Sequence, residues 1–207
     1  MGRGQRADDK RQEILSAARA LFVTQGYADT GMEVVARNAT VSTATLYAHF
    51  PSKADLFHTT VDDLITDIAA QVARGTSSHG DARTRLTRFA EAYAGFCCNP
   101  ATRAVMRMVC AERRRFGAHA HTVEARTHDE IGGAAMRLIA DIAAKGEISV
   151  DRPAWAASQL LGMIEHSTLI YGLVRGDEVQ PERSLGAICE DAVTTFLARY
   201  GVRGTAG

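Results

Sequence analysis

The chain has 207 residues, of which 46% are hydrophobic, and its 24 lysines and arginines balance 24 aspartates and glutamates. This hydrophobic share excludes a disordered tail protein, and the length allows a small head and a larger core. A net charge of zero argues against a protein that coats nucleic acid indiscriminately, although a few cations can still be focused on phosphates.

The residue pattern predicts an all-α protein. The four prolines lie at expected element edges, and the sequence has neither a useful alternating strand pattern nor an apolar run long enough for a membrane. The polar stretch from Met1 to Asp9 lacks an apolar signal core, so we expect a cytoplasmic location.

The N-terminal arm carries a cluster of cations that includes Arg3, Arg6, Lys10 and Arg11. Such an arm can reach a DNA groove or the DNA backbone. The alternative is that the arm is a disordered, solvated end. For Arg3 and Arg6 the two interpretations have about equal weight. Arg6 is the candidate DNA contact in this arm.

Residues 30–57 predict two short helices, a tight turn and the start of a further helix, which is a helix-turn-helix pattern. Thr30 and Glu33 match a capping box, in which each side chain satisfies a backbone N–H at the helix start. The turn is expected at residues 40–42, with Ser42 as the cap of the second helix.

The second helix, from about Ser42 to His49, is expected to be the recognition helix. Leu46 and Phe50 face inward, so the other face presents hydroxyls and a phenol that suit base edges and phosphates in a major groove. The candidate DNA contacts of this unit are Thr30, Ser42, Thr43, Thr45, Tyr47 and His49.

Lys53 places a cation in the first turn of the next helix, after the expected cap Ser52. The helix dipole disfavours a positive charge there by ~0.3–1 kcal/mol. A bound phosphate would reverse this preference, because it attracts both the lysine and the free N–H groups. The alternative is a solvated surface lysine, but beside a recognition helix we predict a phosphate anchor.

Four segments in the first third of the chain resemble the TetR family of bacterial transcriptional regulators: Ile14 to Phe22, Gly26-Tyr27, Val41 to Phe50 and Ser52 to Phe57. The resemblance implies a three-helix DNA-binding head and a helical effector-binding and dimerisation body. It also implies a homodimer that binds a palindromic operator and releases it when a small molecule enters the body. We assign residues 1–68 to the head, with the helix-turn-helix at about 31–50, and residues 69–207 to the body.

Two residues depart from the family's pattern. Thr40 stands where the family usually has glycine before the turn, and Ala44 stands where it often has glycine in the recognition helix. A turn that needs positive φ would strain Thr40, because β-branched residues disfavour that region. Ala44 removes no chemical group.

The body is expected to hold an effector pocket and a dimer interface. The helix after Pro153 is apolar on two opposite faces, so one face should meet the cavity and the other a partner subunit. A pocket of apolar walls with few polar groups is expected at Tyr93, Phe96, Val109, Glu112, Phe116, Gln159, Met163 and His166. The interface is expected at Ile164, Tyr171, Ile188, Val193 and Phe196.

The sparse charge on the expected pocket faces indicates an apolar or aromatic effector. Glu112 lies on an apolar stripe, where a carboxylate is costly unless paired, so it either has a structural partner or contacts the ligand.

A helical enzyme or a redox sensor is the competing hypothesis. Glu112, His166 or a cysteine could act in catalysis, but the sequence has no nucleophile elbow, phosphate loop or metal motif. Adjacent Cys97 and Cys98 could sense oxidants, although such residues more often fill a helix as small apolar groups. We therefore expect a DNA-binding regulator without catalytic residues, cofactor, metal or membrane partner.

Overall fold

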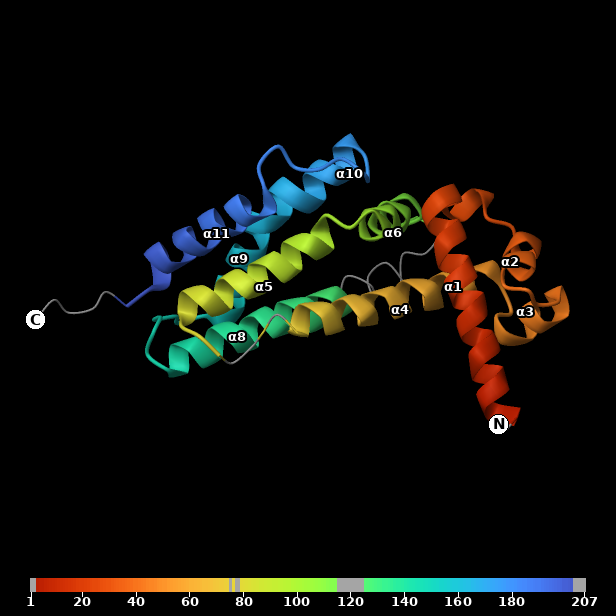
Figure 1. Cartoon of the computed structure of the whole chain (residues 1–207), viewed down its shortest axis with the longest axis horizontal. Helices are drawn as coiled ribbons and strands as arrows, with labels where there is room; N and C mark the ends of the chain where they lie inside the picture. Colours follow the sequence, from red (N-terminus) through yellow and green to blue (C-terminus); the bar gives the residue numbers. More distant parts are fainter. Residues whose placement is uncertain (1–2, 75, 77–78, 115–124, 203–207) are drawn as a thin grey trace, which may run out of the picture. The chain divides into compact units, whose positions relative to one another are not determined.

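The computed structural model describes residues 3–74, 76, 79–114 and 125–202 (Figure 1). Helices joined by turns and loops make up this part of the chain, and an isolated antiparallel bridge joins Ile148 to Gly201. The all-α prediction is therefore confirmed. Among the described helices, none combines the length and the apolar character needed to cross a membrane.

The chain forms two compact units. The first contains Met1–Ile65 and Ala104–Val123, and the second contains Thr66–Arg103 and Glu124–Gly207. The division at Ile65 falls inside helix α4, Lys53–Arg74, near the expected boundary at residue 68. The sequence predicts a contiguous body, whereas the segment that begins at Ala104 groups with the first unit.

The first unit contains α1 (Arg3–Asp29), α2 (Met32–Asn38), α3 (Thr43–His49) and the beginning of α4. Its core includes an aromatic cluster. The centroid of the Phe57 ring lies 5.3 Å from that of Phe22 and 4.9 Å from that of Tyr27. Leu46 from α3 is fully buried. Because burial of such a side chain stabilises by about 1.5–3 kcal/mol, this core fixes the helix-turn-helix.

The capping box predicted at Thr30 and Glu33 is wrong. The N-cap of α2 is Gly31, and no side chain caps this helix. The Thr30 hydroxyl instead donates to the backbone carbonyl of Gly26 at 2.7 Å. A threonine can bond the carbonyl four residues before it, and this local alternative competes with capping.

The turn between α2 and α3 closes with Thr40 in the left-handed region, at φ 56°. The N–H of Val41 donates to the Ala36 carbonyl at 3.0 Å, and the N–H of Thr40 donates to the Arg37 carbonyl at 3.2 Å. This pair of bonds is a Schellman motif, whose left-handed position usually holds glycine. The turn therefore does need positive φ, the condition under which the sequence predicts strain at Thr40.

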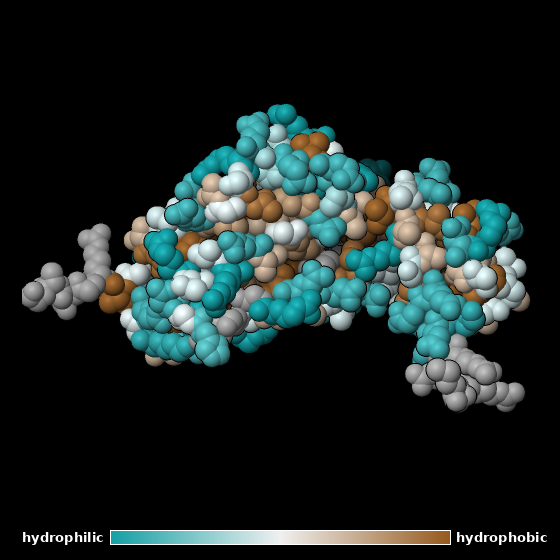
Figure 2. All heavy atoms as spheres, viewed as in Figure 1, coloured by the Kyte–Doolittle hydropathy of each residue, from teal (hydrophilic) through white to brown (hydrophobic). Residues whose placement is uncertain are grey.

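The second unit contains α5 (Ala82–Cys97), the start of α6 (Pro100–Ala111), the π-helical turn η1 (His128–Gly132), α8 (Gly133–Ala144), α9 (Pro153–Glu165), the π-helical turn η2 (His166–Ile170), α10 (Tyr171–Arg175) and α11 (Leu185–Tyr200). Helix α5 packs against α11 and α9, and α8 packs against α9. Leu86, Phe89, Leu160 and Val193 are fully buried among these helices. Figure 2 shows hydrophilic side chains over much of the viewed face, with smaller exposed hydrophobic areas.

Candidate nucleic-acid interface and body surfaces

Helix α3 begins with a side-chain cap, as the sequence predicts. The Ser42 hydroxyl accepts a hydrogen bond from the Thr45 N–H at 3.0 Å, and the two hydroxyls lie 2.8 Å apart. A cap of this kind contributes about 0.5–2 kcal/mol. Ser42 and Thr45 therefore fix the start of the recognition helix as well as lying on its accessible side.

The outer face of α3 is polar and open. Thr43 is exposed, Tyr47 is 49% exposed, and His49 is half-buried, whereas Leu46 points into the core. These side chains are displayed by a helix that is too short to be stable alone, so the head's apolar core must hold them in place. The face can donate and accept hydrogen bonds, which is the chemistry required for base edges and phosphates.

Lys53 lies at the start of α4 but already has partners inside the head. Its ammonium donates to the Ala28 carbonyl at 2.9 Å and lies 4.6 Å from the centroid of the Tyr27 ring. The expected cap is present, since the Asp55 N–H donates to the Ser52 hydroxyl at 3.1 Å. An ammonium has three donors, so a phosphate would share Lys53 with these contacts.

The remaining DNA candidates are Thr30 and Arg6. Thr30 is 1% exposed and its hydroxyl is bonded to Gly26, so it is not part of the DNA-binding surface that we propose. Arg6 belongs to α1, but its side chain lies outside the described part of the structure.

In the body, Tyr93 and Cys97 form a buried polar cluster with Glu165. The Tyr93 hydroxyl donates to the Glu165 carboxylate, and burial raises the pKa of Tyr93 well above its usual range. Burial also raises the pKa of the Cys97 thiol to about 12 and raises that of Cys98. Because the thiolate is the reactive form, these two cysteines lack the environment of redox sensors.

The expected pocket residues are divided between the two units. Val109 and Glu112 belong to the first unit and are half-buried, while the second unit holds buried Tyr93 and Phe96 and half-buried Met163. Neither unit alone contains the whole set. Phe116 lies outside the described residues.

The burial of the two faces of α9 differs from the pattern that the sequence predicts. Gln159 and His166, expected in the pocket, are exposed, whereas Ile164, expected at the interface, is fully buried. Most of the other expected interface residues also belong to the core, at 5%, 0% and 1% exposure for Ile188, Val193 and Phe196, and only Tyr171 is half-exposed. Helical periodicity identifies residues that share a face, but it does not identify the neighbour that the face meets.

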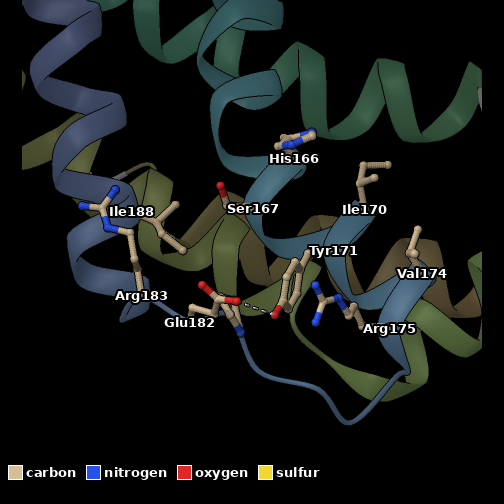
Figure 3. Close-up of a pocket in the computed structure, with 10 residues that line it drawn as sticks. His166, Ser167, Ile170, Tyr171, Val174, Arg175, Glu182, Arg183 and Ile188 are labelled. Carbon is tan, nitrogen blue, oxygen red and sulfur yellow. Dashed lines mark hydrogen bonds between the residues drawn. The ribbon is translucent and has the colours of Figure 1, made fainter.

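The exposed side of η2 and α10 borders a hollow of about 360 Å³ (Figure 3). Tyr171 contributes its ring, and its hydroxyl lies 3.4 Å from the Glu182 carboxylate. The Arg175 guanidinium lies 5.1 Å from the same ring, and Arg183 pairs with Asp191 at 2.6 Å. No sequence pattern indicates this hollow, because the loop before α11 brings Glu182 and Arg183 to it.

Arg103, at the start of α6, is fully buried, and the sequence gives no sign of this role. Its guanidinium donates to the backbone carbonyls of Cys97, Thr168, Asp177 and Val179 at 2.7–3.0 Å. Carbonyl dipoles thus compensate its lost hydration. No side-chain pattern could reveal this role, since every one of these acceptors is a backbone atom.

A three-helix head with a buried apolar core and an exposed polar recognition helix defines a helix-turn-helix DNA-binding protein. Family comparisons agree with this class. Residues 14–60 match the family described as bacterial regulatory proteins of the tetR family, and residues 84–202 match the C-terminal domain of AefR-like transcriptional repressors. The chain therefore belongs to the TetR family of DNA-binding transcriptional regulators, which is not a family of enzymes.

Individual relatives share between 24% and 34% of their aligned residues with this chain. The transcriptional activator FasR of Mycolicibacterium smegmatis is 34% identical over 89 residues, which are 43% of this chain and 41% of that protein. A TetR-family regulator of Mesorhizobium loti superposes with a TM-score of 0.89 at 24% identity, covering 98% of this chain and all of that one. The flavonoid-responsive regulator FrrA superposes with a TM-score of 0.71 at 26% identity. This likeness covers 94% of this chain and 98% of the FrrA chain. The chain thus aligns with less than half of its curated relative, and these likenesses establish the fold.

Proposed function

We propose that this protein is a repressor that binds a palindromic operator as a homodimer and is released by a small molecule. The observation that carries the proposal is the open polar face of α3 on a head whose core fixes its position. The match of residues 84–202 to a repressor family favours repression. FasR is an activator, but its similarity covers less than half of this chain.

In this proposal Thr43 and Tyr47 read DNA most directly, because they are the exposed polar side chains of α3. Ser42 and Thr45 hold the helix start and can also meet phosphates, and His49 lies at its end. Arg6 and Lys53 contribute contacts to the backbone, which carry no sequence information but set the salt dependence.

The proposed effector is an apolar or aromatic small molecule. Tyr93, Phe96 and Met163 of the second unit remain proposed contacts, whereas the exposed Gln159 and His166 are no longer included. The flavonoid response named for FrrA supports an aromatic ligand class for a body of this fold. Such a ligand can release DNA only if it favours the state that does not bind DNA.

A binding titration with the DNA upstream of the chain's own gene tests the DNA-binding part. We expect wild type to bind this fragment in the presence of excess unrelated DNA. Thr43→Ala should change the base preference, while Thr195→Ala, which removes an exposed hydroxyl from α11, should leave it unchanged. Equal affinity of wild type for the fragment and for unrelated DNA would contradict the proposal.

A further inference from the structure

Glu165, at the end of α9, is a half-buried carboxylate with a neutral partner and no cation. Its Oε1 accepts the hydrogen bond from the Tyr93 hydroxyl, and among the described residues the carboxylate has no other hydrogen bond and no ion pair. Burial of a carboxylate is costly unless a cation or several donors compensate it. The buried Arg103 does not do so, because its guanidinium bonds go to backbone carbonyls. Oε2 of Glu165 is therefore available to a donor from outside the chain.

Aromatic rings of α5 flank the Tyr93 end of this pair. The Phe89 ring stacks with the Tyr93 ring at a centroid distance of 6.3 Å, with 13° between the ring planes. The centroid of the Phe96 ring lies 6.0 Å from that of Tyr93. All three rings are buried, and Phe96 keeps the largest exposed fraction, 9%. Because aromatic rings attract cations, rings beside an uncompensated carboxylate favour a positively charged ligand.

The helical segment that carries Glu165 presents apolar side chains next to it. Leu161 and Leu169 lie about one turn before and one turn after Glu165, and both are half-buried. The π-helical turn η2 begins at the residue after Glu165, and such turns inside helices occur often at functional sites. A ligand that reaches the carboxylate would therefore need an apolar or aromatic body beside its charged group.

We propose that Glu165 selects the effector, and that the effector is an organic ammonium ion with an apolar or aromatic body. The ammonium donates to Oε2 of Glu165, while the Tyr93 hydroxyl holds Oε1 and so positions the carboxylate. A neutral donor can also bond Oε2, but it leaves the charge uncompensated. This inference rests on the proposed release by a small molecule and adds the charge of that molecule. Glu165, Tyr93 and their aromatic and apolar neighbours all belong to the second unit.

Three probes with one phenyl ring and different polar ends test the charge preference. They are 2-phenylethylamine, which is protonated at neutral pH, the neutral 2-phenylethanol, and the anion phenylacetate. In calorimetric titrations of wild type, we expect the amine to bind about tenfold more tightly than the alcohol, because the charged hydrogen bond is the stronger one. Phenylacetate should bind least. Binding of the alcohol or of phenylacetate as tight as that of the amine, or no binding of the amine, would overturn the proposal.

Glu165→Gln tests whether this carboxylate is the source of the preference. Glutamine removes the charge but keeps an oxygen that can accept the Tyr93 hydrogen bond, so the fold should persist and the preference for the amine should disappear. Tyr93→Phe keeps the charge, so its preference should remain while its affinity for the amine falls. Glu190→Gln, which removes an exposed carboxylate from α11, is the matched control and should behave as wild type. A preference for the amine that survives Glu165→Gln would assign it to another group.

Operator titrations with the same probes separate this inference from the proposed function. The amine should weaken the binding of wild type to the DNA upstream of its own gene, and the alcohol at the same concentration should have a smaller effect. Release by phenylacetate or by 2-phenylethanol alone would overturn the ammonium ligand and leave a regulator that a small molecule releases. Glu165-dependent binding of the amine with unchanged DNA affinity would support the ammonium site and overturn the release.

Discussion

The Arg103 guanidinium occupies the space where a side chain at position 172 would stand, so Gly172 is required for its burial. A Cβ placed on Gly172 would overlap Nε and Cζ of Arg103. Through its bonds to Cys97, Thr168 and Val179, Arg103 fixes the start of α6 to the end of α5, to η2 and to the loop before α11. One glycine thus permits an arginine to connect several segments of the second unit.

Gly172→Ala should therefore destabilise the protein. Overpacking a buried site costs about 1–3 kcal/mol, and here the added methyl group would also displace hydrogen bonds of Arg103. Urea unfolding measures the change. Gly95→Ala is the matched control, because an added Cβ in this exposed position of α5 meets nothing within 4 Å and should raise stability by up to ~1 kcal/mol. Equal stability of Gly172→Ala and wild type would show that Arg103 can move without cost.

Thr40→Gly should stabilise the head. The left-handed conformation costs an ordinary residue about 1–2 kcal/mol, while glycine loses roughly 0.5–1 kcal/mol in chain entropy. We expect a net gain below about 1.5 kcal/mol in thermal or urea unfolding. Ala44→Gly, the other change towards the family's pattern, should have the opposite sign, because glycine weakens a helix interior. A loss of stability in Thr40→Gly would contradict the strain inferred from its φ of 56°.

Lys53→Ala should have two separable effects. Loss of its contacts with Ala28 and the Tyr27 ring should lower the stability of the head by about 1 kcal/mol. If Lys53 also binds phosphate, the dependence of log affinity on log salt should become shallower in the variant. Its slope should lose about 0.9 in magnitude for each lysine removed. Operator titrations over a salt series, made well below the unfolding temperature, measure the second effect. An unchanged slope would restrict Lys53 to its structural role.

The buried thiols should resist modification in the native protein. Cys110 is exposed and should react with iodoacetamide, whereas Cys97, Cys98 and Cys189 should react only on unfolding. Because folding raises the pKa of Cys97 from 9.0 to about 12, it keeps the thiol protonated, and the free energy of unfolding should fall as pH rises through this interval. Mass spectrometry measures the rate of modification at each cysteine. Rapid modification of Cys97 in the native protein would restore the redox-sensor hypothesis.

Local features of the fold were predictable because their causes lie within a few residues. The Ser42 and Ser52 caps follow from residue types at fixed positions, and the left-handed Thr40 follows from the glycine that the family usually has there. Thr30 shows the limit of such patterns, since its hydroxyl had a second local acceptor, the Gly26 carbonyl.

The surfaces of the body were harder to predict. Ile164 and His166 lie on opposite faces of one helical segment, and apolar residues occur on both faces. The sequence therefore revealed two faces without showing which one meets the core. Only the packing of α9 against α5, α8 and α11 decides this, and these contacts join residues far apart in the chain.

Selection of binding sites from random duplex DNA tests the central claim most directly. If two heads bind DNA through α3, the enriched sequences should share a palindrome of two equivalent half-sites. Thr43→Ala should alter the preferred base at the same position of both half-sites. Enrichment of an asymmetric single site, or no enrichment over unrelated DNA, would contradict a homodimeric operator-binding regulator.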